Sequence, residues 1–262
     1  MTPIGILFSL LAVIGAMTMD HGSIGSLFKV SSLLLVVGGS LGASVAGFAL
    51  HQLRPIPKAL MIVLKPRKGP DTRETIDELL AIAKEARSNP LILEEMKTED
   101  AFMKKGIQLI ISTSDPERVH ELLTAEIDGL RARHQTAEKF FSDLAGYSPT
   151  FGIIGTVIGL IGVLGQLSSP GKLGPAIASA FTATLWGVML ANAVWLPISN
   201  KFRRLTEEEM TFREMVVVGL LTMQLNASTT ELKDRLEAFL SPSERARVPT
   251  RAASGEAPDA AA

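Results

Sequence analysis

Four stretches of this sequence carry no charged side chain over a length that can cross a membrane. They run from Pro3 to Met19, from about Val30 to Leu50, from Pro149 to Leu167 and from about Leu173 to Ile198. A helix needs roughly 20 mostly apolar residues to cross the hydrocarbon core, so each stretch is predicted to be a transmembrane helix. We therefore predict an all-α integral membrane protein with four transmembrane helices in two hairpins, whose long helices extend into a cytoplasmic helical domain.

The first stretch has an alternative interpretation as a secretory signal peptide. A signal peptide begins with a positively charged region, but Met1 to Phe8 contains no Lys or Arg. A second apolar stretch follows within about a dozen residues, where a signal peptide would be followed by a mature soluble sequence. The sequence favours a span that is retained.

The distribution of Lys and Arg predicts the orientation. The two short linkers inside the hairpins hold one Lys each, Lys29 and Lys172. Basic residues follow the second and fourth spans: Arg54, Lys58, Lys65, Arg67, Lys68, Lys201, Arg203 and Arg204. Because basic residues near span ends stay on the cytoplasmic side, both termini are predicted to be cytoplasmic.

This organisation divides the chain into five parts. Residues 1–50 hold the first two spans, 51–148 a cytoplasmic helical domain and 149–198 the last two spans. Residues 199–240 form a C-terminal cytoplasmic helical region, in which Thr206 to Leu240 is predicted to continue as a helix. The remainder, 241–262, is rich in Pro, Ala and Ser without apolar periodicity and is predicted to be disordered.

Two cytoplasmic helices have recognisable starts. Asp71, with Glu74 three residues later, predicts the N-terminus of a helix over 71–87. Asp115 followed by Pro116 predicts the start of a second helix that runs to about Leu144. Apolar residues at helical spacing support both: Ile76, Leu79, Leu80 and Ala83 in the first, and Val119, Leu122, Leu123, Ile127 and Leu130 in the second.

The residue content excludes several kinds of chemistry. The chain has no cysteine, which excludes disulfides and thiolate metal sites, and its four histidines lack metal-binding spacing. A net charge of −1 gives no basic face for nucleic acid. No set of nucleophile, base and acid appears, so we predict neither an enzyme nor a cofactor.

The spans contain no Asp, Glu, Lys, Arg or His. If the protein conducts an ion, a partner must supply the ionisable group.

Small residues lie on one face of each of the last two spans. In the third span they are Gly152, Gly155, Thr156, Gly159 and Gly162, and in the fourth Ala176, Ala180, Thr184, Gly187 and Ala191. Such faces allow close packing of helices, which is one interpretation. The other is that Thr156 and Thr184 line a wet path beside a partner helix.

Five segments resemble the MotA family of flagellar stator subunits, within the MotA/TolQ/ExbB group. They are SPTFGIIGTVIGLIGVL (148–164), TATLWGVMLANAVWLPISNKF (182–202), SLLLVVGGSLGA (32–43), EARSNPLILEEM (85–96) and EMVVVGLLTMQLNASTTELKDRLEAFLSP (214–242). The resemblance covers nearly the whole chain apart from its tail. Four spans are typical of the stator type and distinguish it from TolQ and ExbB.

The resemblance implies a bacterial inner-membrane protein that forms a five-fold ring around two copies of a MotB-type partner. That partner would supply a single span with the ion-binding Asp and a cell-wall-binding domain. Flow of H⁺ or Na⁺ would turn the ring, whose cytoplasmic part pushes the rotor switch protein of the flagellum. A TolQ/ExbB-like energiser of the cell envelope and a scaffold without ion flux are the alternative functions.

The resemblance also assigns roles to single residues. Pro149 and Pro197 match the two mechanistic prolines of the family, for which helix punctuation is the alternative. Thr156 and Thr184 match threonines near the ion path of sodium-type members, whereas Ala183 stands where those members often have another threonine. Two charges match the rotor-contacting segment: Arg87, and either Glu94 or Glu95. A solvated helix face is the alternative for these charges.

Overall fold

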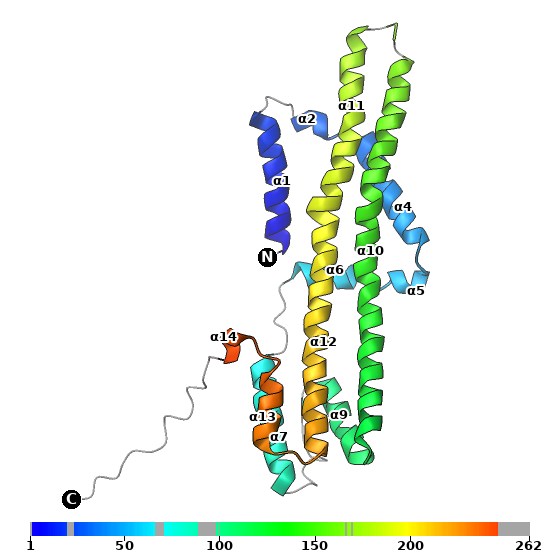
Figure 1. The fold of residues 1–262 in the computed structure, drawn as a ribbon. Helices are drawn as coiled ribbons and strands as arrows, with labels where there is room; N and C mark the ends of the chain where they lie inside the picture. The colour runs from blue at the N-terminus through cyan, green and yellow to red at the C-terminus, as the bar shows by residue number, and fades with distance from the viewer. Residues whose placement is uncertain are drawn as a thin grey trace, which may run out of the picture. The chain divides into compact units, whose positions relative to one another are not determined.

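The computed structural model describes residues 2–19, 24–65, 71–88, 98, 100–165, 167–168 and 170–245. Every regular element in these residues is a helix (Figure 1). The chain divides into two compact units, one of Met1–Arg67 with Leu130–Glu207 and the other of Lys68–Gly129 with Glu208–Ala262. Two long helices, α10 and α12, contribute to both.

The first unit contains the apolar helices. Along the chain they are α1 (Thr2–Met19), α2 (Ile24–Leu27), α3 (Val30–Leu33), η1 (Leu34–Gly38), α4 (Gly39–Ala46), α5 (Leu50–Leu53), α6 (Ile56–Leu64), α10 (Pro116–Leu164), α11 (Pro170–Met189), η2 (Leu190–Trp195) and α12 (Leu196–Gln224). Among the described residues, three helices are long and apolar enough to cross a membrane: Thr2–Met19, Pro116–Leu164 and Gly171–Gln224. The all-α membrane architecture is therefore confirmed.

The predicted second span is a shorter apolar helix, Val30–Ala46. It ends before the predicted Leu50, because the backbone turns at Gly47, whose N–H donates to the Ser44 carbonyl at 3.1 Å. A new helix, α5, begins at Leu50, and the side chain of Gln52 accepts from the Ala49 N–H at 2.9 Å. The run of α3, η1 and α4 is at the lower end of the lengths that cross a bilayer.

Two of the apolar helices contain a π-helical segment, η1 and η2. Such segments disturb the regular i to i−4 hydrogen bonds, and a nearby polar side chain bonds a carbonyl in each case. Ser40 donates to the Val36 carbonyl at 2.6 Å, and the Asn192 amide donates to the Val188 carbonyl at 2.9 Å. Pro197, which has no N–H to donate, lies in the first turn of α12, two residues after the end of η2.

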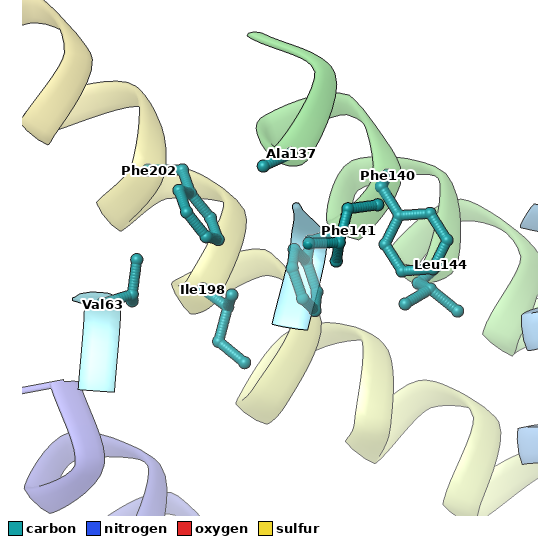
Figure 2. Close-up of a cluster of buried hydrophobic side chains, with 8 residues drawn as sticks. Val63, Ala137, Phe140, Phe141, Leu144, Ile198 and Phe202 are labelled. Carbon is teal, nitrogen blue, oxygen red and sulfur yellow. The ribbon is translucent and has the colours of Figure 1, made fainter. Parts of the chain in front are cut away.

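A cluster of buried apolar side chains packs α6, α10 and α12 together (Figure 2). Its members are Ile56, Val63, Ala137, Phe140, Phe141, Leu144, Ile198 and Phe202. Phe141 lies at the centre, with its ring stacked on Phe202 at a centroid distance of 5.6 Å and edge-on to Phe140 at 5.4 Å. Aromatic pairs of this kind add to the stabilisation from area burial.

The second unit is a helical domain of charged surface and apolar core. It holds α7 (Thr72–Ser88), α9 (Ala101–Ser112), α13 (Thr229–Glu237) and α14 (Pro242–Arg245), together with the first part of α10 and the last part of α12. Leu79, Met103, Leu123, Leu220 and Leu236 are almost fully buried in its core. Asp71 accepts from the Arg73 and Glu74 N–H groups and Asp115 from that of Glu117, so both predicted helix starts are confirmed.

Several details of this unit differ from the prediction. The helix expected over Thr206 to Leu240 is interrupted after Gln224, where Asn226 adopts a left-handed backbone with φ of 55°. The N–H groups of Asn226 and Ala227 bond the carbonyls of Met223 and Thr222, which is a Schellman C-cap. Leu122, one of the apolar residues at helical spacing, is 43% exposed. The tail predicted from residue 241 first forms the short helix α14.

Candidate functional site

The backbones of α10 and α11 approach closely along their small residues. A Cβ atom added to Gly187 would lie 2.6 Å from the Ser148 carbonyl oxygen and 3.0 Å from the Gly152 Cα. Added to Gly159, it would lie 2.6 Å from the Cβ of Ala180. These positions therefore have no room for a side chain, and small residues permit the contact.

One predicted member of this face lies outside the contact. A Cβ atom on Gly162 would meet nothing within 4 Å, so the close contact of α10 with α11 ends before Gly162. A third element, η1, also takes part in this contact. A Cβ atom on Gly155 would lie 2.5 Å from Ala183 of α11 and 3.0 Å from Leu35 of η1. The small residue Ala183 thus has a packing role.

The hydroxyl groups of Thr156 and Thr184 meet between α10 and α11 and hydrogen-bond to each other. Thr156 also reaches the carbonyl oxygens of Gly152 at 3.2 Å and Ala180 at 3.3 Å, and Thr184 reaches that of Gly152 at 3.2 Å. Both side chains are half-buried. The structure therefore brings the two predicted threonines together as a group of oxygen atoms in an apolar environment.

The two predicted prolines occupy different local structures. Pro149 lies inside the continuous helix α10, where it cannot donate to the carbonyl four residues earlier. Next to it, Ser148 is fully buried and donates to the Leu144 carbonyl at 2.7 Å. Pro197 follows a π-helical segment. Both prolines therefore lie where the helix hydrogen bonding is locally altered.

The segment that joins the first two apolar helices is fixed to the outside of α11. The Trp186 indole donates to the Leu27 carbonyl at 2.7 Å, and its ring packs against Phe28 at 5.8 Å. The Lys29 ammonium group donates to the Ser179 hydroxyl. Trp186 follows Thr184 by two residues, so these contacts lie on the face of α11 roughly opposite to Thr184.

Arg87 lies near the end of α7 on an exposed part of the second unit. Its guanidinium donates to the Asn226 carbonyl at 3.0 Å, directly after the end of α12. A cation at a helix C-terminus interacts favourably with the helix dipole. Glu94 and Glu95, the other predicted rotor contacts, lie outside the described residues.

Two polar side chains in the last span were not predicted to be functional. Thr182 is buried and donates to the Ala178 carbonyl at 3.1 Å. Asn192 is exposed in the single chain and bonds Val188. An amide within an apolar run is itself a signal, since polar residues in membrane helices commonly form contacts between helices.

Comparison with known proteins decides the family. Residues 3–90 match the "Motility protein A N-terminal" family, and residues 94–215 match the "MotA/TolQ/ExbB proton channel family". Motility protein A of Cereibacter sphaeroides is 31% identical over 90% of this chain and 93% of its own length. This chain belongs to the motility protein A family. The resemblance of the five sequence segments is thereby confirmed.

Two further proteins extend the comparison. The chemotaxis protein PomA of Vibrio alginolyticus is 31% identical to this motility protein A homologue over 94% of the chain and 96% of its own length. The structure titled "Structure of the flagellar MotAB stator complex from Bacillus subtilis" superposes with a TM-score of 0.87 at 28% identity, and covers 93% of this chain and 96% of its own.

Proposed function

We propose that this chain is a stator subunit of a flagellar motor, which couples ion flow across the inner membrane to torque on the rotor. The observation that carries the proposal is similarity to motility protein A homologues over almost the entire chain, both in sequence and in fold. The chain contributes conduction and mechanical work to this role and is not an enzyme. It belongs in the inner membrane with both termini in the cytoplasm, as its basic residues indicate.

The stator acts as an assembly of several copies of this chain around a MotB-type partner. A Bacillus subtilis relative was solved as a MotAB stator complex. The apolar spans of this chain contain no ionisable residue, so the single span of the partner provides the ion-binding Asp. Five copies of this chain form the ring.

The Thr156 and Thr184 hydroxyls form this chain's part of the ion path. A hydroxyl group both donates and accepts a hydrogen bond, so the pair can hold a water molecule beside a carboxylate or offer oxygen atoms to Na⁺. Their bonds to the Gly152 and Ala180 carbonyls fix the positions of these oxygen atoms. The path carries H⁺ or Na⁺. Pro149 and Pro197 are the points at which α10 and α12 bend as the ion passes.

The rotor contact lies in the second unit. Arg87 and one of Glu94 or Glu95 engage the rotor switch protein through charge. Arg87 suits this role because it is exposed, while its bond to the Asn226 carbonyl fixes its direction. Charge complementarity between two surfaces steers their encounter and fixes their register.

Deletion of the gene in the organism that encodes it tests the proposed function. A stator subunit is needed for rotation but not for filament assembly, so the deletion strain should keep its flagellar filaments and stop swimming. Electron microscopy counts the filaments, and tracking measures the speed. A plasmid copy of the gene should restore swimming. Unchanged swimming, or the loss of filaments, would contradict the proposal.

A further inference from the structure

One face of α11, η2 and the start of α12 is exposed over its whole length in the single chain. It presents a stripe at spacings of three and four residues: Ile177, Phe181, Leu185, Val188, Asn192 and Leu196. Phe181 is 59% exposed and Val188 46% exposed. All its members except Asn192 are apolar. Contiguous apolar stripes at this spacing fit the surface of another helix.

Asn192 shows that this stripe does not simply face lipid. Its amide donates one N–H to the Val188 carbonyl at 2.9 Å, and no other hydrogen bond of its carboxamide is found within the described residues. The side chain is exposed in the single chain, so its second N–H and its carbonyl oxygen are accessible to a group of another chain. An unpaired amide in hydrocarbon is unfavourable, so a polar group of another chain should meet it.

The exposed face of α10 offers one such group at the same level. Thr150 is exposed and donates to the Tyr147 carbonyl at 2.7 Å, which leaves its oxygen atom free to accept. Gly146, one turn earlier, is also exposed, and a Cβ atom there would meet nothing within 4 Å. The surface around Thr150 is therefore open to an approaching helix.

The packing of α10 on α11 gives the relative depths. Gly187 lies against Ser148, Pro149 and Gly152, and Ala180 lies against Gly159, so the two helices are antiparallel. The backbone of Asn192 lies more than one turn after Gly187. Because helical side chains lean toward the N-terminus of their helix, the amide of Asn192 reaches back to the level of Val188. The Thr150 hydroxyl leans the opposite way, to the level of Tyr147. Both polar groups therefore lie at one depth.

We propose that Asn192 of one copy donates its second amide N–H to the Thr150 hydroxyl of the neighbouring copy, with the exposed stripe of α11 packed on the exposed face of α10. Rotation about an axis normal to the membrane keeps depth unchanged, so a ring of copies places these two groups at the same level. This inference rests on the multi-copy ring of the proposed function. The neighbouring copy is favoured over the MotB-type partner because the matching acceptor is a residue of this chain at the required depth.

Cysteine cross-linking tests the contact, since the natural chain has no cysteine. The double variant Asn192→Cys with Thr150→Cys is treated in membranes with a short thiol-specific cross-linker, in the presence of the partner. Because each copy carries one cysteine for each neighbour, a ladder of multimers of this chain is expected. Each single variant should give no ladder. The control pair is Asn192→Cys with Ile161→Cys, in which the α10 cysteine is displaced by about 16 Å along the helix.

The outcomes separate this contact from the ring itself. A ladder from the Asn192–Thr150 pair alone supports the contact. No ladder, an equal ladder from the control pair, or an adduct of Asn192→Cys with the partner would overturn it. The mass of the purified, unmodified complex reports independently whether several copies assemble. Monomers in that measurement would contradict the proposed function, whereas multimers without the ladder would contradict only the contact.

A double-variant cycle provides a test without cysteine. Asn192→Ala and Thr150→Ala should each lower the temperature at which the detergent-purified complex dissociates. If the two groups bond to each other, the double variant should dissociate at about the temperature of the weaker single variant. Additive downward shifts would overturn the proposal, and so would no shift in either single variant.

Discussion

Among the described residues of the apolar helices, several hydroxyl groups bond only to carbonyls of their own helix. Ser40, Ser148 and Thr182 each donate to the carbonyl four residues earlier. Such bonds satisfy the hydroxyl without any partner helix. Thr156 and Thr184 differ because they also bond to each other across two helices. This difference, rather than the presence of a threonine, distinguishes the candidate ion path.

Sequence reasoning located this pair through small-residue spacing and family resemblance. It could not exclude Gly162 from the contact between α10 and α11, because residue spacing does not predict how far along the helix such a contact extends. Nor did it recognise that Ala183 packs against the position of Gly155, which requires knowledge of the helix register. Spacing thus predicts which residues share a face but not where two faces separate.

Replacement of Gly187 by Ala should disrupt the contact of α10 with α11. The added methyl group would lie 2.6 Å from a backbone oxygen, which cannot move like a flexible side chain. Overpacking of this kind costs about 1–3 kcal/mol. The expected result is a lower melting temperature of the detergent-purified protein, measured by tryptophan fluorescence, and slower swimming.

Gly174 in the same helix is the matched control, because a Cβ atom there would meet nothing within 4 Å. Gly174→Ala should keep or raise the melting temperature, since Ala favours a helix over Gly by about 1 kcal/mol. Equal melting temperatures for both variants would contradict the close contact.

At the scale of elements, the long apolar helices are predicted directly by uncharged sequence, whereas the prediction of helices in the second unit depends on local signals. The starts at Asp71 and Asp115 carried such signals and were predicted. The end of α12 at Gln224 was missed, although Asn226, Ser228 and Thr229 are residue types that favour caps and turns over helix interiors. Only the left-handed Asn226 and the Ser228 cap of α13 reveal the break. Helix α9 was also missed, although Asp100 caps it through the Met103 N–H at 2.8 Å.

Replacement of Arg87 by Ala should reduce swimming far more than it reduces stability. The lost hydrogen bond lies on an exposed side chain and is expected to cost about 0.5–1.5 kcal/mol at most. If the guanidinium engages the rotor, however, swimming speed should fall severely. Tracking of cells and thermal unfolding of the purified protein measure the two effects separately.

Arg235→Ala is the control for this prediction, because Arg235 is also exposed and pairs with Glu231 one turn earlier at 2.7 Å. Loss of that pair should change stability by about 0.5 kcal/mol or less and leave swimming intact. If Arg87→Ala cells swim as fast as the Arg235→Ala cells, the rotor contact does not depend on Arg87.

For the whole molecule, the proposed orientation makes a prediction about accessibility. Ser168 lies between α10 and α11, and Ser243 lies in α14 after the last apolar helix. In a chain without natural cysteines, Ser168→Cys should react with a membrane-impermeant maleimide in intact spheroplasts, whereas Ser243→Cys should react only after lysis. The reverse pattern would contradict the cytoplasmic placement of the termini.

We propose above all that the Thr156 and Thr184 hydroxyls serve an ion path that drives rotation. The most direct measurement is the rotation speed of tethered cells in the deletion strain, which express the wild-type chain, the Thr156→Ala/Thr184→Ala variant or the Thr156→Ser/Thr184→Ser variant at equal membrane levels. We predict that rotation stops with alanine at both positions and largely returns with serine, which keeps the hydroxyl groups. Wild-type speed in the double alanine variant would contradict the claim.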